Sequence, residues 1–281
     1  MSLLGTIYII SKGRPQCRTA QTLERIKFPG EWFIVCGTND ETLEQYIERW
    51  GGRVLTFDFE KQLETTDTMD PFGFGEMASG ACPVRNATRG ISRERGELRH
   101  WQLDDDYTGF QTFDSKTGKR PTVKDGAELY ERMERIAEFG HECGLANVGF
   151  TPAGIAASRE NARNYSPRVF NAHNMPSDPE KFVTWVGRMN DDLINAINVY
   201  RTGRGPEFSF NFVSMNMPAT QSENGGLSEL YREEGTVRKT AYAVMAAPGA
   251  VKLVERFGRY HHAVDWKFLV PKIVHSKYRK R

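Results

Sequence analysis

Short apolar runs alternate with amphipathic segments in the first part of the chain, and this alternation limits the possible folds more than any other feature. Residues 6–11, 32–36 and 53–57 are rich in β-branched and aromatic side chains, as buried strands are. Residues 18–25 and 41–50 lie between them and have helical patterns. Strands and helices in alternation predict a parallel sheet. We therefore expect an α/β fold with a Rossmann-like, mostly parallel central sheet flanked by helices.

The pattern is less regular after residue 57. A loop without periodicity is predicted for 60–80 and a helix for 85–95. Asp125 has the position of a helix N-cap, and the helix that follows it would bury Leu129 and Met133. The remaining predictions are strands at 100–103, 147–150, 168–172 and 207–217, a helix at 190–200 and a loop at 220–226.

The composition is that of a folded protein. Hydrophobic residues make up 39% and charged residues 26%, which argues against disorder as the main state. The 4 cysteines show no CxxC spacing, so neither a structural zinc site nor a disulfide framework is indicated. A formal net charge of +2 does not by itself indicate a nucleic-acid binder. We expect one domain over 1–281 with a basic C-terminal tail over 266–281, which is either solvated or in contact with phosphates.

Three consecutive aspartates, Asp104, Asp105 and Asp106, follow the strand predicted at 100–103. Because side chains alternate along a strand, Asp104 and Asp106 would point to one side and Asp105 to the other. The carboxyl ends of strands are where open α/β sheets bind ligands. Mg²⁺ or Mn²⁺ held there by carboxylates can neutralise a pyrophosphate. We favour a metal site at Asp104 and Asp106 over the alternative, a solvated turn.

Arg85 and Asn86 lie upstream of these acids. Arg85 can contact phosphate and Asn86 can hydrogen-bond a ribose, whereas the alternative is that both residues cap a helix. Together with the Ser11-Lys12-Gly13-Arg14 loop and the three aspartates, this segment resembles family-2-like GT-A glycosyltransferases over residues 6–110. The resemblance implies a GT-A fold and a C-terminal extension on the acceptor side. The donor-binding residues that it implies are Ser11, Lys12, Arg14, Arg85, Asn86, Asp104 and Asp105.

A second acidic pair, Asp191 and Asp192, begins the helix predicted at 190–200. It is similar to the acceptor-side Glu-Asp motif of inverting GT-A enzymes, with Asp191 in place of the glutamate. The resemblance implies that Asp192 deprotonates the acceptor hydroxyl, with Asp191 beside it as a second catalytic residue. Acids at a helix start are also favoured by the helix dipole alone. Many GT-A enzymes complete the metal shell with a late histidine, which implies His262 in preference to His261.

Residues 223–231, 235–240 and 245–248 extend the likeness. They are similar to phage-encoded TET-associated glycosyltransferases, which decorate hydroxymethylated pyrimidines in phage DNA. This narrower resemblance implies a UDP-sugar donor, Mn²⁺ or Mg²⁺ as cofactor and modified double-stranded DNA as acceptor. We therefore expect a nucleotide-sugar-binding half over 1–110 and an acceptor-binding half over 111–265.

Several alternatives remain open at this stage. The acceptor could be a polysaccharide or protein, and the enzyme could be a sugar-nucleotide nucleotidyltransferase. A non-catalytic DNA-binding protein would leave the three aspartates without a purpose. Arg93, Arg95 and Arg99 are candidate contacts to DNA phosphates. Without a signal peptide or membrane-spanning run, we expect no membrane association. We also infer no obligate protein partner. The predicted location is the cytoplasm, or the host cytoplasm if a phage encodes the chain.

Overall fold

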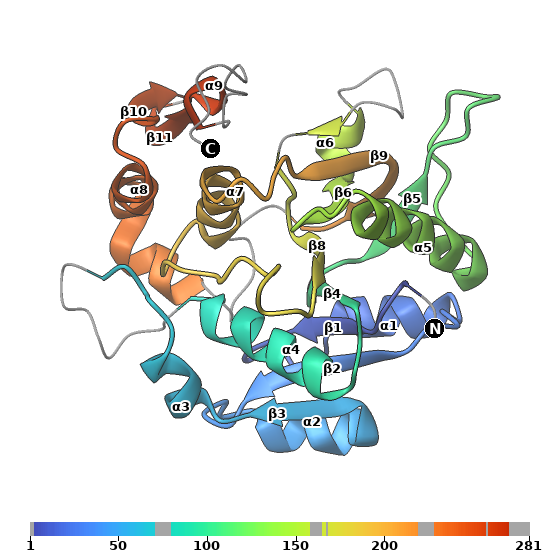
Figure 1. Cartoon of the computed structure of the whole chain (residues 1–281). Helices are drawn as coiled ribbons and strands as arrows, with labels where there is room; N and C mark the ends of the chain where they lie inside the picture. The colour runs from blue at the N-terminus through green and yellow to red at the C-terminus, as the bar shows by residue number, and fades with distance from the viewer. Residues whose placement is uncertain are drawn as a thin grey trace, which may run out of the picture.

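The computed structural model describes residues 3–70, 80–157, 165–166, 168–218, 228–256 and 258–269. A central sheet runs through the molecule between helices, and a separate two-stranded sheet lies at one side (Figure 1). The predicted loop at 220–226, the end of the predicted loop at 60–80 and most of the 266–281 tail lie outside the described residues.

The first half of the sheet is parallel. Strands β3, β2, β1 and β4 lie side by side in that order. The strand bounds are Ile7–Ile10 (β1), Trp32–Gly37 (β2), Val54–Phe57 (β3) and Arg99–Asp104 (β4). The connecting helices are α1 (Arg18–Arg25), α2 (Leu43–Trp50), the 3₁₀ turn η1 (Gly51–Arg53), α3 (Phe59–Glu64) and α4 (Cys82–Glu94). Parallel strands require such crossovers, and the predicted α/β fold class is confirmed.

Beyond β4 the strands run in both directions. Strand β8 (Ala172–Pro176) is antiparallel to β4 and to β6 (Val148–Pro152). Strand β6 is parallel to β9 (Phe208–Asn216), and β5 (Gly109–Thr112) and β7 (Tyr165–Ser166) are both antiparallel to β9. The helices of this half are α5 (Gly126–Glu142), α6 (Ala153–Ala157) and α7 (Asp191–Arg201).

Side-chain alternation gives the parallel half of the sheet two different faces. On one face, Ile9 and Leu103 pack into the apolar core with buried residues of α1, α2 and α5. On the other face, Gln102 Nε2 donates to Thr88 Oγ1 of α4 at 2.6 Å and to the Arg85 carbonyl at 2.9 Å. A buried polar layer therefore separates α4 from the sheet, and residues at the end of β4 can meet either an apolar or a polar neighbourhood.

The C-terminal part adds a layer against α7. It consists of α8 (Ser228–Ala246, kinked at Gly235), β10 (Val251–Arg256), β11 (Arg259–Val264) and α9 (Trp266–Leu269). Leu193 and Ile197 of α7 pack with Ala243 of α8 and Val251 of β10. None of the described helices has both the length and the apolar character needed to cross a bilayer.

Several element predictions can be compared directly. Helix α1 has the predicted bounds, and Asp125 caps α5 by accepting the Ala127 amide at 2.9 Å. The predicted loop at 60–80 was wrong at its start, where Asp58 caps the short helix α3. The strand predicted at 168–172 begins instead at Ala172, because Asn171 has a left-handed backbone with φ 61°.

Candidate active site

The carboxyl end of β4, between β1 and β8, presents the predicted aspartates. Asp104 is the last residue of β4 and points toward α4, where Arg85 Nη2 donates to its Oδ1 at 3.1 Å. Asn171, just before β8, donates from Nδ2 to Asp104 Oδ2 at 2.5 Å. Burial raises the pKa of Asp104, and the Arg85 and Asn171 contacts oppose this rise. The carboxylate is thus held from two sides.

Asp105 points to the opposite face, as strand alternation predicts. Its Oδ2 accepts from Ser11 Oγ at 2.5 Å, and its Oδ1 accepts from Arg14 Nη1 at 2.9 Å. Tyr46 of α2 adds a third tie, since its hydroxyl lies 2.5 Å from Ser11 Oγ and accepts the Arg14 amide at 2.9 Å. Asp105 therefore anchors the loop after β1. Lys12, at the exposed side of this loop, lies with Nζ 5.5 Å from the centre of the Phe59 ring.

Asp106 lies in the turn that follows β4. Its Oδ1 is buried and has no hydrogen-bond partner among the described residues. Burial raises the pKa of Asp106 to about 7, and the negative charges of Asp104 and Asp105 add to the rise. A divalent cation would relieve both effects, because it would bind the orphaned oxygen and offset the repulsion between the carboxylates.

The aspartates therefore fit a cation. In the described part of the chain, no group of three or more His, Cys, Asp or Glu residues could hold a metal by itself. Mg²⁺ at phosphate-transfer sites is usually bound by one or two carboxylates together with substrate phosphates and water. Asp104 and Asp106 match that smaller ligand set, and their role as metal ligands stays a prediction.

Arg85 joins the two acidic motifs. Its guanidinium donates from Nη2 to Asp104 and from Nε to Asp191 Oδ2, the latter at 2.8 Å. The side chain is buried, and its Cζ lies 4.6 Å from the centre of the Trp185 ring. Burial alone would lower the pKa of Arg85, but its two carboxylate partners outweigh that effect and raise it. The structure thus brings the carboxyl end of β4 and the start of α7 into one buried ionic network.

Asn86 has a different contact from the one predicted. Its Nδ2 donates to the Trp185 carbonyl at 3.0 Å, and its Oδ1 accepts the Trp185 amide at 2.9 Å. Both ends of the buried amide are therefore occupied by one peptide segment. In this arrangement Asn86 fastens the residues before α7 to α4, and through them it positions Trp185 beneath Arg85.

Asp191 and Asp192 occupy the first turn of α7, after an N-cap residue, Asn190, with a left-handed backbone. Burial raises the pKa of Asp191, with Arg85 opposing the rise. Burial alone would also raise the pKa of Asp192, but an ion pair with Arg168 Nη2 outweighs it and lowers the pKa to about 2. Asp192 is therefore ionised at neutral pH, as a general base must be. Arg168 in turn stacks on Phe170, with Cζ 4.3 Å from the ring centre.

The C-terminal layer contributes cationic and titratable groups near Asp192. Burial lowers the pKa of Lys239 on α8, while Asp192 opposes the change. Burial also lowers the pKa of His262 on β11, to about 4, and Arg168 lowers it further. Asp192 acts on His262 in the opposite direction. His262 thus neighbours the candidate base, and its role as a metal ligand stays a prediction.

Sequence reasoning missed several residues of this site. Asn171, Arg168, Tyr46 and Trp185 each contact a predicted residue, yet none belongs to a recognisable motif. The proposed phosphate contacts also need correction at Arg99. It is buried, donates to Asn174 Oδ1 at 2.6 Å and to the Leu145 carbonyl at 2.9 Å, and so cannot reach DNA.

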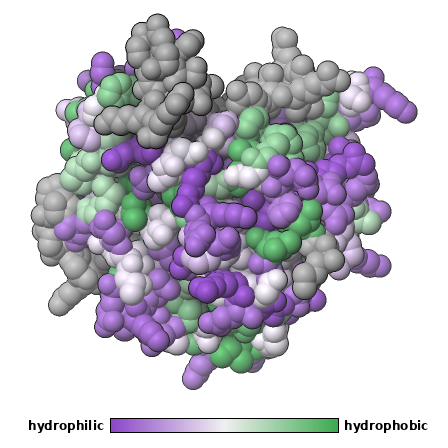
Figure 2. All heavy atoms as spheres, viewed as in Figure 1, coloured by the Kyte–Doolittle hydropathy of each residue, from purple (hydrophilic) through white to green (hydrophobic). Residues whose placement is uncertain are grey.

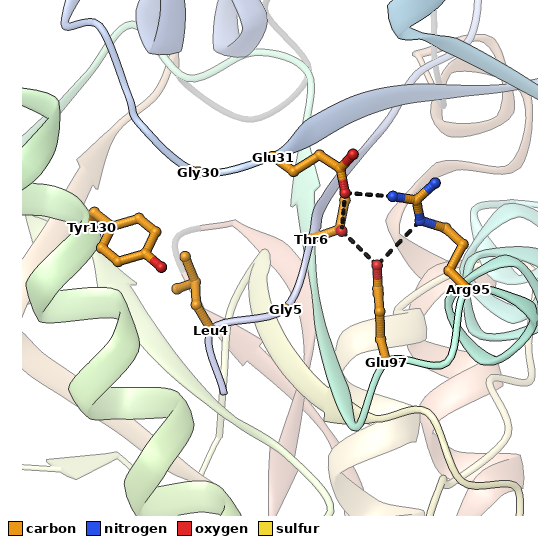
Figure 3. A pocket seen from close by; sticks show the side chains of 8 residues that line it. All are labelled: Leu4, Gly5, Thr6, Gly30, Glu31, Arg95, Glu97 and Tyr130. Atoms are coloured by element: carbon orange, nitrogen blue, oxygen red, sulfur yellow. Dashed lines mark hydrogen bonds and ion pairs between the residues drawn. The ribbon is translucent and has the colours of Figure 1, made fainter. Parts of the chain in front are cut away.

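Arg95 is the second correction. It lines a pocket at the opposite end of the parallel strands from the aspartates. This cavity of about 310 Å³ lies at the amino ends of β1, β2 and β4. Figure 3 shows Arg95 bridging Glu31 and Glu97. Thr6 Oγ1 donates to Glu97 Oε1 at 2.5 Å. The carboxyl ends of the same parallel strands carry the aspartates. Neither Arg95 nor this pocket is therefore part of the candidate active site. Arg93 is exposed in the last turn of α4, at the same end of the sheet as Arg95.

Comparison with known proteins identifies the family of the chain. No curated protein matches the chain. A model of the TET-associated glycosyltransferase family, however, matches residues 6–226, which include both acidic motifs, Arg85 and Arg168. The match covers most of the chain and removes the nucleotidyltransferase and non-catalytic alternatives. The chain belongs to the TET-associated glycosyltransferase family and is a glycosyltransferase.

Proposed function

We propose that this enzyme transfers a sugar from a UDP-linked donor to the hydroxymethyl group of a modified pyrimidine in double-stranded DNA, with Mn²⁺ or Mg²⁺ as cofactor. The observation that carries the proposal is the bridge from Asp104 through Arg85 to Asp191. It joins the strand end where α/β sheets bind nucleotides to the helix start that bears the candidate base. In this proposal, donor and acceptor would bind on either side of the Arg85 guanidinium.

On the donor side, the loop after β1 would receive the nucleotide. Ser11 and Arg14 are held by Asp105, and Lys12 remains exposed beside them. Basic side chains at a strand end suit a diphosphate, because charge-assisted hydrogen bonds to phosphate are strong. Asp104 and Asp106 would hold the cation, which supplies positive charge against the departing diphosphate when bound.

On the acceptor side, Asp192 would accept the proton of the hydroxymethyl group. The acceptor oxygen then forms a bond to the anomeric carbon as the bond from that carbon to the diphosphate breaks, and UDP leaves. Asp191 would not compete for the proton, because its Oδ2 is held by Arg85. Its contribution is to fix the first turn of α7 relative to the donor site. The family name, TET-associated glycosyltransferase, supports a DNA acceptor.

The test uses purified full-length enzyme, Mn²⁺ and a panel of nucleotide sugars. UDP release should occur with a UDP-sugar and increase when duplex DNA containing hydroxymethylcytosine is added. Unmodified duplex and simple glycans serve as acceptor controls. Transfer to glycans alone would overturn the proposal of a DNA acceptor. Sugar transfer only from nucleotide sugars other than UDP-sugars would overturn the proposal of a UDP-linked donor.

Substitution of Asp106 tests the cation site. Asp106→Asn should abolish the Mn²⁺-dependent part of turnover and the heat of Mn²⁺ binding measured with UDP by calorimetry. Asp178→Asn is the matched control, because Asp178 is an exposed aspartate after β8. Unchanged Mn²⁺ binding by the Asp106 variant would contradict the assignment of this residue as a ligand.

A further inference from the structure

The hairpin formed by β10 and β11 is separate from the central sheet and lies outside the residues matched by the family. It packs on α8, where Thr240 Oγ1 lies 3.5 Å from the Tyr260 carbonyl. Helix α8 in turn contacts the start of α7, because Asn190 Nδ2 donates to the Lys239 carbonyl at 2.6 Å. The hairpin is therefore coupled through one helix to the turn that bears Asp192.

One face of the hairpin is basic. In the antiparallel register, Arg256 lies opposite Arg259 and Lys252 opposite Ala263, which places these side chains on the same face. All three cations are exposed, and no carboxylate among the described residues forms an ion pair with any of them. Three exposed cations without an ion pair among the described residues therefore share one face of the hairpin.

The other face carries Leu253, Tyr260 and His262, and it also carries the exposed Glu255, which lies opposite Tyr260. Leu253 is 53% exposed and Tyr260 is 47% exposed, although both are large apolar side chains. His262 on this face is the residue that interacts with Arg168 and Asp192. An exposed apolar side chain and an exposed aromatic side chain therefore lie on the same face as His262, beside the single acid Glu255. In Figure 2, hydrophobic and hydrophilic residues lie side by side in this upper left region, where Figure 1 places the hairpin and α8.

These features match the chemistry of duplex DNA. The major groove accommodates a two-stranded β-ribbon, and hydroxymethyl groups on pyrimidine C5 project into that groove. From Lys252 to Arg256 the strand rises by about 13 Å, so the cations can reach several phosphates along one backbone. Aromatic and apolar side chains beside such cations are suited to contact with bases. A free nucleoside, with no flanking phosphates, could not use the basic face.

We propose that the β10–β11 hairpin is the element that docks duplex DNA, with Lys252, Arg256 and Arg259 on backbone phosphates and Tyr260 facing the bases beside Asp192. The inference rests on the proposed DNA acceptor. It adds that the preference of the enzyme for duplex over free nucleoside is set by the hairpin rather than by the matched GT-A core.

The test combines Lys252→Gln, Arg256→Gln and Arg259→Gln in one full-length variant. The matched control combines Lys116→Gln, Lys119→Gln and Lys124→Gln, which remove the same charge from exposed sites around β5 and the start of α5, on the opposite side of Figure 1. Binding of fluorescent unmodified duplex is measured by anisotropy between 50 and 300 mM NaCl. This measurement requires no acceptor hydroxyl, so it separates the hairpin from the chemistry. Circular dichroism and melting temperature establish that both variants fold.

The hairpin variant should bind more weakly. Its plot of log K for DNA association against log salt should also be shallower, with a slope less negative by about 2.7, at roughly 0.9 for each lost phosphate contact. Its ratio of kcat/KM on hydroxymethylated duplex to that on free hydroxymethyl nucleoside should fall, while the control retains both values. If wild-type enzyme transfers sugar to modified duplex but the hairpin variant matches the control, the hairpin inference is wrong and the proposed function stands. Wild-type enzyme that neither binds duplex nor modifies it would overturn both.

Discussion

Replacement of Arg85 tests the ionic bridge that joins the two halves of the site. Arg85→Met retains much of the side-chain volume against Trp185 but leaves Asp104 and Asp191 without their shared partner. The Arg85 side chain is only 4% exposed, that of Asp104 is 22% exposed and that of Asp191 is 11% exposed. Removal of one member of a buried ion pair typically costs about 3–5 kcal/mol, because a desolvated charge remains. We expect a loss of that size in the free energy of unfolding at pH 7.

Arg95→Met is the matched comparison. Arg95 follows α4 directly and also binds two carboxylates, Glu31 and Glu97, but its side chain is 34% exposed and that of Glu31 is 52% exposed. Water and salt screen such pairs, and they contribute roughly 0–1 kcal/mol. The two variants remove the same group from the two ends of α4, so the difference between them reports burial rather than loss of a charge.

The effect of Arg85→Met should also depend on pH. Burial already raises the pKa of Asp104 and of Asp191, and Arg85 opposes both rises. A carboxyl whose pKa is raised in the folded state destabilises the fold as the pH increases above the pKa of the same group in the unfolded chain, which is about 4. Loss of Arg85 raises both pKa values further. The stability gap to wild type should therefore be largest at pH 7 and smaller at pH 4.5.

Urea unfolding at the two pH values measures this gap. Groups that titrate equally in both proteins cancel in the comparison. The reasoning is refuted if Arg85→Met costs no more than Arg95→Met at pH 7, or if its deficit grows as the pH is lowered.

Three further predictions concern the acceptor side. Asp192→Asn should reduce transfer to modified DNA far more than donor hydrolysis, as measured by UDP release with and without acceptor; equal losses would make Asp192 structural. Arg168→Gln should move the acid limb of the kcat/KM profile for transfer to higher pH, because the ion pair lowers the pKa of Asp192 to about 2, and an unmoved limb would exclude Asp192 as the titrating base. Burial raises the pKa of Glu207 to about 8, so wild type should lose about 4 kcal/mol of stability relative to Glu207→Gln between pH 5 and pH 8. Parallel urea-stability curves for those two proteins would contradict this last prediction.

Much of the parallel half of the fold could be predicted from local patterns. Helix α1 and the strands around it follow directly from apolar periodicity, and alternation along β4 sends Asp104 and Asp105 to opposite faces as expected. Helix α3 was missed because one capped turn and a half is too short for a periodic signal. Antiparallel insertion of β8 next to β4 could not be predicted either, since strand order depends on long-range pairing that no local pattern specifies.

The amino-acid sequence alone determined the alternation of strands and helices, the position of three acids beyond a buried strand, and the likeness to GT-A enzymes. Only the tertiary structure decided that Arg85 meets Asp191, 106 residues away, and that Arg168 meets Asp192. Periodicity reports which face of an element is buried, because it reflects repeated local geometry. The partner of a buried charge depends instead on distance and desolvation, and both arise only when remote segments pack together.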